Sequence, residues 1–262
     1  MKKSWNKEGI GKTLAAIVSI TCFLLIWHAV TSLTALGNIL PGPIATLEAF
    51  FRSFVQPIGR YTIWGHIFWS LSRVLVGFLA AAVCGIILGI AMSRYRLVEA
   101  IASPFYEMIR PIPPIAWISL AILWFGLGEP MKYFIIFIGA FNNITINVYM
   151  GGKSVDQELV GVARMLGANE KQVFTTVVIP ATVPYIFAGL HIGLSISWAT
   201  VVAAEMVRSS EGLGWIVVSG MDFNDIGQIL VGIMAIGIMG FLLITAMRAL
   251  EAKICEWNVR GV

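Results

Sequence analysis

The sequence predicts an all-α integral membrane protein with six transmembrane helices, and three observations carry this prediction. Of the 262 residues, 58% are hydrophobic and only 12% are charged, whereas soluble domains carry about 25% charged residues. The mean hydropathy is +0.85. The apolar residues also gather into runs close to the length of about 20 residues that a helix needs to cross a bilayer.

The first apolar run, residues 13–33, follows a basic start, MKKSWNKEGIGK. A basic segment before an apolar run is also typical of a signal peptide. This run is longer than a signal-peptide core, however, and no small-x-small cleavage site follows it. We therefore expect residues 13–33 to form a retained first transmembrane helix.

The segment after the first run contains PGPIATLEAFFRSFV, in which a Pro-Gly-Pro turn precedes apolar side chains at helical spacing. The apolar positions are Ile44, Leu47, Phe50, Phe51 and Phe54. This pattern predicts an amphipathic helix over residues 43–55 that lies at the outer, periplasmic membrane interface.

Four further runs, residues 74–92, 133–150, 182–206 and 226–247, are long enough to span the membrane. The run at 115–127 is shorter and would rise only about 20 Å as a helix. It can span only when extended backwards through RPIPP at 110–114, to residues 105–127. Clustered prolines in a short apolar stretch indicate a broken or kinked span. We expect residues 1–262 to form a single transmembrane domain.

Basic residues are distributed unequally between the two sides of this six-span arrangement. Thirteen of the 18 fall on the side of the N-terminus. The other five are Arg52, Arg60, Arg73, Lys132 and Arg208. Since cytoplasmic segments carry the excess of Lys and Arg, both termini are predicted to be cytoplasmic, and residues 153–180 with them.

A hydrophilic segment, KSVDQELVGVARMLGANEKQVFTTVVIP, occupies residues 153–180 of this otherwise apolar chain. Ser154 and Gln157 have capping-box spacing, and Asp156 and Glu158 place negative charge in the first turn, so a helix is predicted to start there. Its apolar residues form one stripe at helical spacing: Val155, Leu159, Val162, Ala163 and Leu166.

A second short helix is predicted after a glycine turn. Gly167 suits a left-handed C-terminal stop, Asn169 and Gln172 repeat the capping-box spacing, and Pro180 is expected to end the helix. Because Lys171 is the only cation after the turn, a DNA-binding helix-turn-helix is excluded. Two interpretations stay open: a helix pair that covers the ends of the spans, and a docking surface for a soluble partner.

Polar side chains inside the predicted spans are candidates for a translocation pathway. They are Asn142, Asn143, Asn147, His191, Ser195, Thr200 and Glu205. Interhelical hydrogen bonding is the favoured alternative for the amides. A carboxylate at the bilayer centre costs at least about 2.5–3.5 kcal/mol. For Glu205 an i,i+3 pair with Arg208 is therefore favoured over a substrate role or proton coupling.

Catalytic and metal-binding patterns are not found in the sequence. The three cysteines, Cys22, Cys84 and Cys255, are far apart and lack CxxC or CxxH spacing. There is no Ser-His-Asp, Cys-His or paired-carboxylate arrangement, so we expect no catalytic residue, no metal site and no cofactor in this chain. The basic residues are scattered at a net charge of +4, and no nucleic-acid partner is expected.

The hydrophilic segment resembles the cytoplasmic "EAA" loop of ABC-importer permeases, which reads Glu-Ala-Ala, three residues, Gly, nine residues, then Ile-x-Leu-Pro. Gly167 and the run VVIP at 177–180 fit that spacing, and Ala163 fits the second alanine. The glutamate of the pattern falls on Gly161 and its first alanine on Val162. Two longer blocks, RPIPPIAWISLAILWFGLGE and GLHIGLSISWATVVAAEMVRSSEGLGWIV, look like the nitrate/sulfonate/taurine permeases of this family.

The resemblance implies a type I ABC-importer permease fold with a cytoplasmic coupling-helix hairpin in the loop at residues 153–180. It implies a permease homodimer in a bacterial inner membrane, two ABC ATPase subunits that bind the ATP and Mg, and an extracytoplasmic substrate-binding protein. The lack of a GxxxxGK[ST] loop agrees with this. The ATPase contacts it implies are Val162, Ala163, Arg164, Leu166, Gly167, Ala168 and Asn169.

The implied function is ATP-driven import of a small oxyanion by alternating access, with taurine or another sulfonate ahead of nitrate or bicarbonate. Two other classes stay open: a stand-alone ion-coupled secondary transporter or channel, and a membrane-embedded enzyme. The former would move solute without an ATPase. The latter would need polar residues that converge on a nucleophile or metal.

Overall fold

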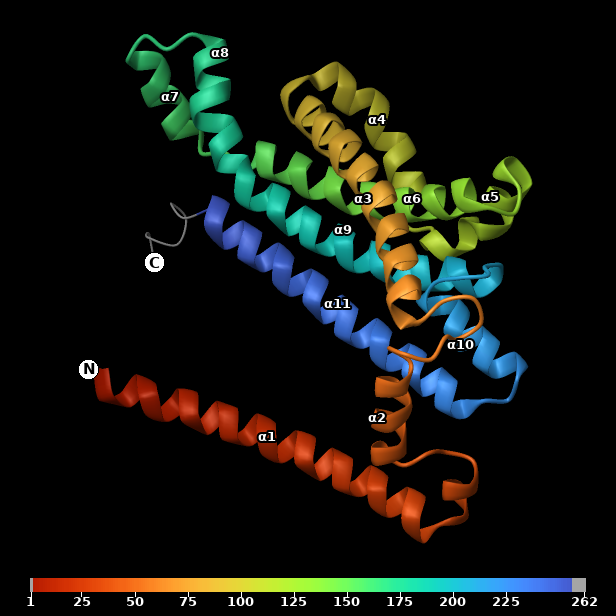
Figure 1. Cartoon of the computed structure of the whole chain (residues 1–262). Helices are drawn as coiled ribbons and strands as arrows, with labels where there is room; N and C mark the ends of the chain where they lie inside the picture. The colour runs from red at the N-terminus through yellow and green to blue at the C-terminus, as the bar shows by residue number, and fades with distance from the viewer. Residues whose placement is uncertain (1, 256–262) are drawn as a thin grey trace. The chain divides into compact units, whose positions relative to one another are not determined.

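The computed structural model describes residues 2–255, which are helical apart from turns and an isolated antiparallel bridge between Ile58 and Tyr61 (Figure 1). The chain divides into two compact units. One unit contains residues 1–63 and 216–234, and the other contains residues 64–215 and 235–262. Both units are helical where they are described, so the predicted all-α class is confirmed.

Five helical segments of the described chain are long and apolar enough to cross a membrane, and a bent pair of helices raises the number to six. The five are α1 (Lys2–Leu33), α3 (Ile63–Arg94), α6 (Glu129–Lys153), the α8–α9 segment (Glu170–Val207) and α11 (Ile226–Ile254). In α1 the apolar part is Leu14–Leu33. These segments cover every long apolar run in the sequence, and α3 begins well before the predicted residue 74.

The sixth candidate span is broken at the proline cluster. Helix α4 (Arg96–Ile109) and the segment formed by the 3-10 helix η2 (Pro114–Trp117) and α5 (Ile118–Phe125) meet at an angle of 88°. Proline lacks the N–H that a helix interior needs, and it disfavours helical geometry in the residue before it. RPIPP therefore interrupts the span, and residues 105–127 do not form one continuous helix.

The unit formed by residues 1–63 and 216–234 contains α1, the 3-10 helix η1 (Ala35–Asn38) and α2 (Pro43–Arg52), with parts of α10 (Leu213–Asp222) and α11. Helix α2 begins with proline at its first position, where the missing N–H costs nothing. Phe50 is buried and meets Phe54 edge-on at 5.2 Å. The predicted amphipathic helix at 43–55 is thus a helix that ends at Arg52.

In the other unit α3 and α9 (Ile179–Val207) both pack against α6. The fully buried Ile144 of α6 lies between Gly85 of α3 and Gly193 of α9, and a Cβ at either glycine would lie 3.0 Å from Ile144. Small residues let helices approach this closely without a hydrophobic driving force in lipid. The three helices form the scaffold that carries the candidate sites.

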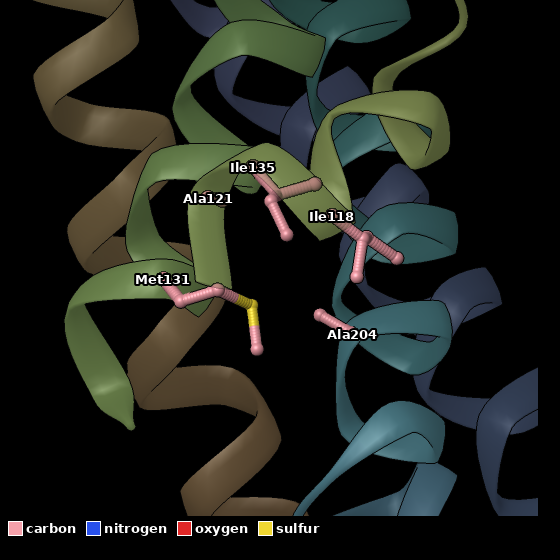
Figure 2. Close-up of a cluster of buried hydrophobic side chains, with 5 residues drawn as sticks. All are labelled: Ile118, Ala121, Met131, Ile135 and Ala204. Atoms are coloured by element: carbon pink, nitrogen blue, oxygen red, sulfur yellow. The ribbon is translucent and has the colours of Figure 1, made fainter. Parts of the chain in front are cut away.

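A buried apolar cluster joins α5, α6 and α9 in the same unit (Figure 2). It consists of Ile118, Ala121, Met131, Ile135 and Ala204. The sulfur-bearing side chain of Met131 and the two isoleucines fill the space between the ribbons. The short helix α5 after the break is thereby fixed against the two long helices.

Candidate functional site

The hydrophilic segment forms a helical hairpin, in which α7 (Gln157–Met165) and α8 (Glu170–Val173) are joined by a tight turn (Figure 1). Gly167 has φ +86°, the left-handed conformation that glycine adopts without a Cβ penalty. The Asn169 side chain accepts from the Gln172 N–H at 2.9 Å, and the Asn169 N–H donates to the Gln172 side chain at 2.8 Å. Both turn predictions are confirmed.

Two other predictions about this segment are wrong. The N-cap of α7 is Asp156, whose carboxylate accepts from the Glu158 N–H at 2.8 Å, whereas Ser154 is the residue that ends α6. Pro180 does not end the second helix. It lies in the first turn of α9, and a π-helical turn, Phe174–Val178, joins α8 to α9 without a break. The π-helical turn interrupts the regular i→i−4 hydrogen bonding directly before Pro180, and a residue without an N–H is tolerated at such an interruption.

The hairpin has a buried face and an exposed apolar face. Val155, Val160 and Val173 form a small core, against which Ala163 and Ala168 pack. The exposed face, which we call the hairpin patch, consists of Leu159, Val162, Met165 and Leu166, with Met165 81% and Leu166 84% exposed. The predicted single stripe therefore divides, because Val155 and Ala163 face inward. An exposed apolar patch of this kind marks a surface that contacts something else.

An ion-pair bridge connects the hairpin to α3. Glu170 lies 2.8 Å from Arg164 of α7 and 3.3 Å from Arg94 at the end of α3. All three side chains are at least 42% exposed, so the bridge contributes little to the stability of the fold. It links α7 and α8 of the hairpin to the end of α3. Glu170 was not among the predicted site residues, because its local signal is only that of an acidic residue in the first turn of α8.

The asparagines of α6 bond mainly within their own helix. Asn143 donates to the carbonyl of Gly139 at 3.0 Å, and Asn147 donates to the carbonyl of Asn143 at 2.8 Å. Within residues 2–255, the side-chain amides of Asn143 and Asn147 thus donate to their own helix and not, as was predicted, to a neighbouring one. Asn142, Asn143 and Asn147 are each partly exposed, which leaves them as candidates for contact with a polar path.

The polar residues of α9 are not all brought together. His191 Nε2 lies 2.8 Å from a carboxylate oxygen of Glu251 in α11, and the Ser195 hydroxyl donates to the His191 carbonyl at 3.0 Å. These residues line an open groove between α9 and α11. Thr200 is instead buried, near Gly139 of α6.

Glu205 is buried, at 1% exposure, and is fully engaged. One carboxylate oxygen accepts from Arg73 at 2.8 Å, the other accepts from the Gly214 N–H at 2.9 Å, and the Ser70 hydroxyl lies 2.9 Å from both. The predicted pair of Glu205 with Arg208 is wrong. Arg208 lies at the end of α9 in extended backbone, and Arg73 of α3 forms the ion pair with Glu205.

Arg73 itself was predicted to lie in an outer loop, and this too is wrong, since its side chain is fully buried within α3. Two of its nitrogens donate to the two carboxylate oxygens of Glu129, each at 2.7 Å, and it also reaches the backbone and side chain of Glu211. Arg73, Glu129, Glu205 and Glu211 form what we call the arginine cluster. It ties α3, α6, α9 and the loop before α10 together.

Within residues 2–255, no group of three or more His, Cys, Asp or Glu side chains could hold a metal ion.

Comparison with known proteins gives the family. Residues 81–254 match the family described as "Binding-protein-dependent transport system inner membrane component". This chain belongs to that family. The permease resemblance of the hydrophilic segment and the two longer blocks is thereby confirmed.

Two curated relatives of the permease are similar along nearly their whole length. The taurine transport system permease protein TauC of Escherichia coli is 36% identical over 246 residues, which cover 93% of this chain and 89% of that protein. The nitrate import permease protein NrtB of Synechocystis is 36% identical over 248 residues, which cover 93% of this chain and 90% of that protein.

Two solved structures share the fold of the permease at low sequence identity. An amino acid ABC transporter chain has a TM-score of 0.58 at 14% identity, with 80% of this chain and 94% of that chain covered. A chain of the MetNI methionine ABC transporter has a TM-score of 0.54 at 18% identity, with 79% of this chain and 95% of that chain covered. The predicted ABC-importer permease fold is confirmed.

Proposed function

We propose that this permease forms the translocation pathway of an ATP-binding-cassette importer for a small oxyanion. Relatives are named for taurine, nitrate, aliphatic sulfonates and bicarbonate, and each of these solutes is a small oxyanion. Taurine or another sulfonate is the first choice for this chain, followed by nitrate or bicarbonate. The chain would act as a homodimer with two ABC ATPase subunits and an extracytoplasmic binding protein.

The hairpin patch is the observation that carries the proposal. Leu159, Val162, Met165 and Leu166 present exposed apolar side chains on a segment that is otherwise charged. We assign this patch to a groove on an ABC ATPase. Ala163, Arg164, Gly167, Ala168 and Asn169 would shape and orient the hairpin within that groove, without the glutamate that other members carry at the position of Gly161.

The connection between the hairpin and α9 supports coupling by alternating access. Helix α8 continues through the π-helical turn into α9, so the docked hairpin and the span are one continuous helical segment, Glu170–Val207. Movement of two ATPases toward each other would draw the hairpins together and tilt these segments. Side chains on the accessible faces of α6 and α9, among them Asn142, Asn143, Asn147, His191 and Ser195, would then face the solute.

The test inserts a negative charge into the patch. Because Leu166 is 84% exposed, Leu166→Glu should leave the fold intact, yet it would place a charge in an apolar interface, where an unpaired charge is costly. We expect about a hundredfold weaker association with the ATPase, and ATP hydrolysis that loaded binding protein no longer stimulates. Gln157→Glu is the matched control, since it adds the same charge to an exposed position of the same hairpin outside the patch.

Equal ATPase association in the two variants would contradict docking through the patch. A second measurement addresses the class of transporter. If the purified chain alone drove gradient-dependent uptake in liposomes, at the rate of the complex with ATPase, the proposal of an ATP-driven importer would be replaced by that of a secondary transporter.

A further inference from the structure

The groove between α9 and α11 combines polar and apolar walls. It has a volume of about 580 Å³ and is lined by His191, Ile192, Ser195, Ile196, Ile244, Arg248 and Glu251. Ionisable residues on transmembrane segments are rare, and they mark solute or ion pathways when they face a cavity. His191 lies within the α9 span, while Arg248 and Glu251 follow the apolar run 226–247 of α11, so the groove brings an intramembrane histidine next to two charges at the end of a span.

In this groove the Glu251 carboxylate contacts the neighbouring helix and not the nearby arginine of its own helix. Arg248 and Glu251 are three residues apart on α11, a spacing at which opposite charges normally pair. Glu251 instead pairs with His191 of α9 at 2.8 Å. Within the described part of the chain, no carboxylate lies within 4.0 Å of Arg248, and its side chain is exposed. The cross-helix contact thus engages the Glu251 carboxylate and leaves the Arg248 guanidinium without a carboxylate partner among residues 2–255.

We propose that Arg248 is an oxyanion contact of the permease itself, and that the His191–Glu251 pair keeps Arg248 free by holding the neighbouring carboxylate away. This inference rests on the proposed function, whose solute it places in the groove. A guanidinium presents a planar fork of donors that binds two oxygens of a sulfonate, nitrate or carboxylate at once. Ile192 and Ile244 offer apolar contact to an alkyl chain.

Glu251 would also limit how tightly the anion is held. Its carboxylate lies on the same groove, and like charges in a partly desolvated site repel. A site that combines one strong donor with a nearby repulsive charge binds an anion and releases it again, as a conduction path requires. Arg248 and Glu251 lie in the last two turns of α11, so the site belongs to one end of the path.

The experiment measures the initial rate of ATP-dependent uptake in proteoliposomes that contain the complete complex with saturating loaded binding protein. Taurine, nitrate and bicarbonate serve as labelled probes, and the one that the wild-type complex takes up fastest is used throughout. We expect Arg248→Gln to lower the initial rate of uptake about tenfold, because a charge-assisted contact between the guanidinium and the anion is lost. Arg248→Lys should retain part of the rate.

Lys253→Gln is the matched control, because it removes an exposed positive charge from the last turn of the same helix, outside the groove. His191→Ala tests the second half of the inference. Without His191, Glu251 is expected to turn to Arg248, and uptake should fall as far as in Arg248→Gln. The double variant His191→Ala with Glu251→Gln removes the competing carboxylate and should recover part of the uptake, since the charge that aids release is also removed.

The outcomes separate the inference from the function on which it rests. If wild type couples ATP hydrolysis to uptake but Arg248→Gln behaves like Lys253→Gln, or the double variant stays as slow as His191→Ala, the inference is overturned and the proposed function stands. A wild-type complex that takes up none of the probes overturns both. The assay is repeated in phosphatidylcholine alone and with phosphatidylglycerol. An effect of Arg248→Gln seen only with phosphatidylglycerol would assign the arginine to a lipid headgroup and overturn the solute contact.

Discussion

Arg73 illustrates what single residues contribute to this membrane protein. Its side chain is fully buried and contacts three carboxylates whose positions in the sequence are 56, 132 and 138 residues away. Local spacing cannot reveal such partners, and the partner predicted for Glu205 was therefore the nearby Arg208. Arg73 was placed outside the membrane-spanning helix because the long apolar run starts at residue 74, whereas α3 begins at Ile63.

Arg73→Gln should destabilise the protein more than other losses of a single positive charge. Glu205 would keep Ser70 and the Gly214 N–H but lose its counter-charge while remaining buried, a change that costs about 3–5 kcal/mol when one partner of a buried pair is removed. The free energy of unfolding in detergent micelles provides the measurement.

Arg52→Gln is the comparison for this prediction. Arg52 is 70% exposed and lies 3.9 Å from Glu48, so its removal should change the free energy of unfolding by at most about 0.5 kcal/mol. If the two variants unfolded at the same denaturant concentration, the arginine cluster would contribute no net stability.

At the scale of elements, the hairpin shows which signals are local and which are not. The turn at Gly167 and the cap at Asn169 were predicted correctly because both depend on residues within four positions. The start at Ser154 and the stop at Pro180 were wrong because each depends on a neighbouring helix: α6 extends to Lys153, and α9 begins at Ile179. A proline near a helix start and one after a helix end look alike in sequence.

Two glycines of the hairpin allow the effect of backbone conformation on the stability of the hairpin to be measured without changes in packing. At both Gly161 and Gly167 an added Cβ would meet no atom within 4 Å, so alanine differs only in its backbone preference. Gly161 lies within α7 and Gly167 has φ +86°. Gly167→Ala should cost about 1–2 kcal/mol of local stability, whereas Gly161→Ala should gain about 0.5–1 kcal/mol.

Hydrogen exchange of the amides in residues 157–173 measures this difference directly. Protection should fall about tenfold in Gly167→Ala, since about 1.4 kcal/mol corresponds to a factor of ten, and it should rise in Gly161→Ala. A fall in protection of equal size in both variants would mean that the turn conformation is not what stabilises the hairpin.

For the whole molecule, the number of spans follows from composition, but their connections do not. Apolar runs of about 20 residues identified five of the spans, and the proline cluster RPIPP identified the break in the sixth. The 88° bend depends on how α5 packs against Met131 and Ala204, which no local pattern encodes. The arginine cluster and the groove at Arg248 also join residues from distant helices, so only the three-dimensional structure reveals them.

The orientation of the chain is the last prediction, and the structure strengthens its basis. Two of the five basic residues counted on the outer side, Arg73 and Lys132, are buried in ion pairs within helices, so the side opposite the N-terminus presents even fewer basic residues in its connecting segments. The positive-inside rule then predicts that both termini and the hairpin lie in the cytoplasm and that α2 lies outside.

Single cysteines, introduced in a background with Cys22, Cys84 and Cys255 replaced by alanine, test this orientation. Gln56→Cys should react with a membrane-impermeant maleimide in spheroplasts, and Lys171→Cys should react only after permeabilisation. Both positions are exposed, so the reverse pattern would mean an inverted topology and would also remove the hairpin patch from reach of a cytoplasmic ATPase.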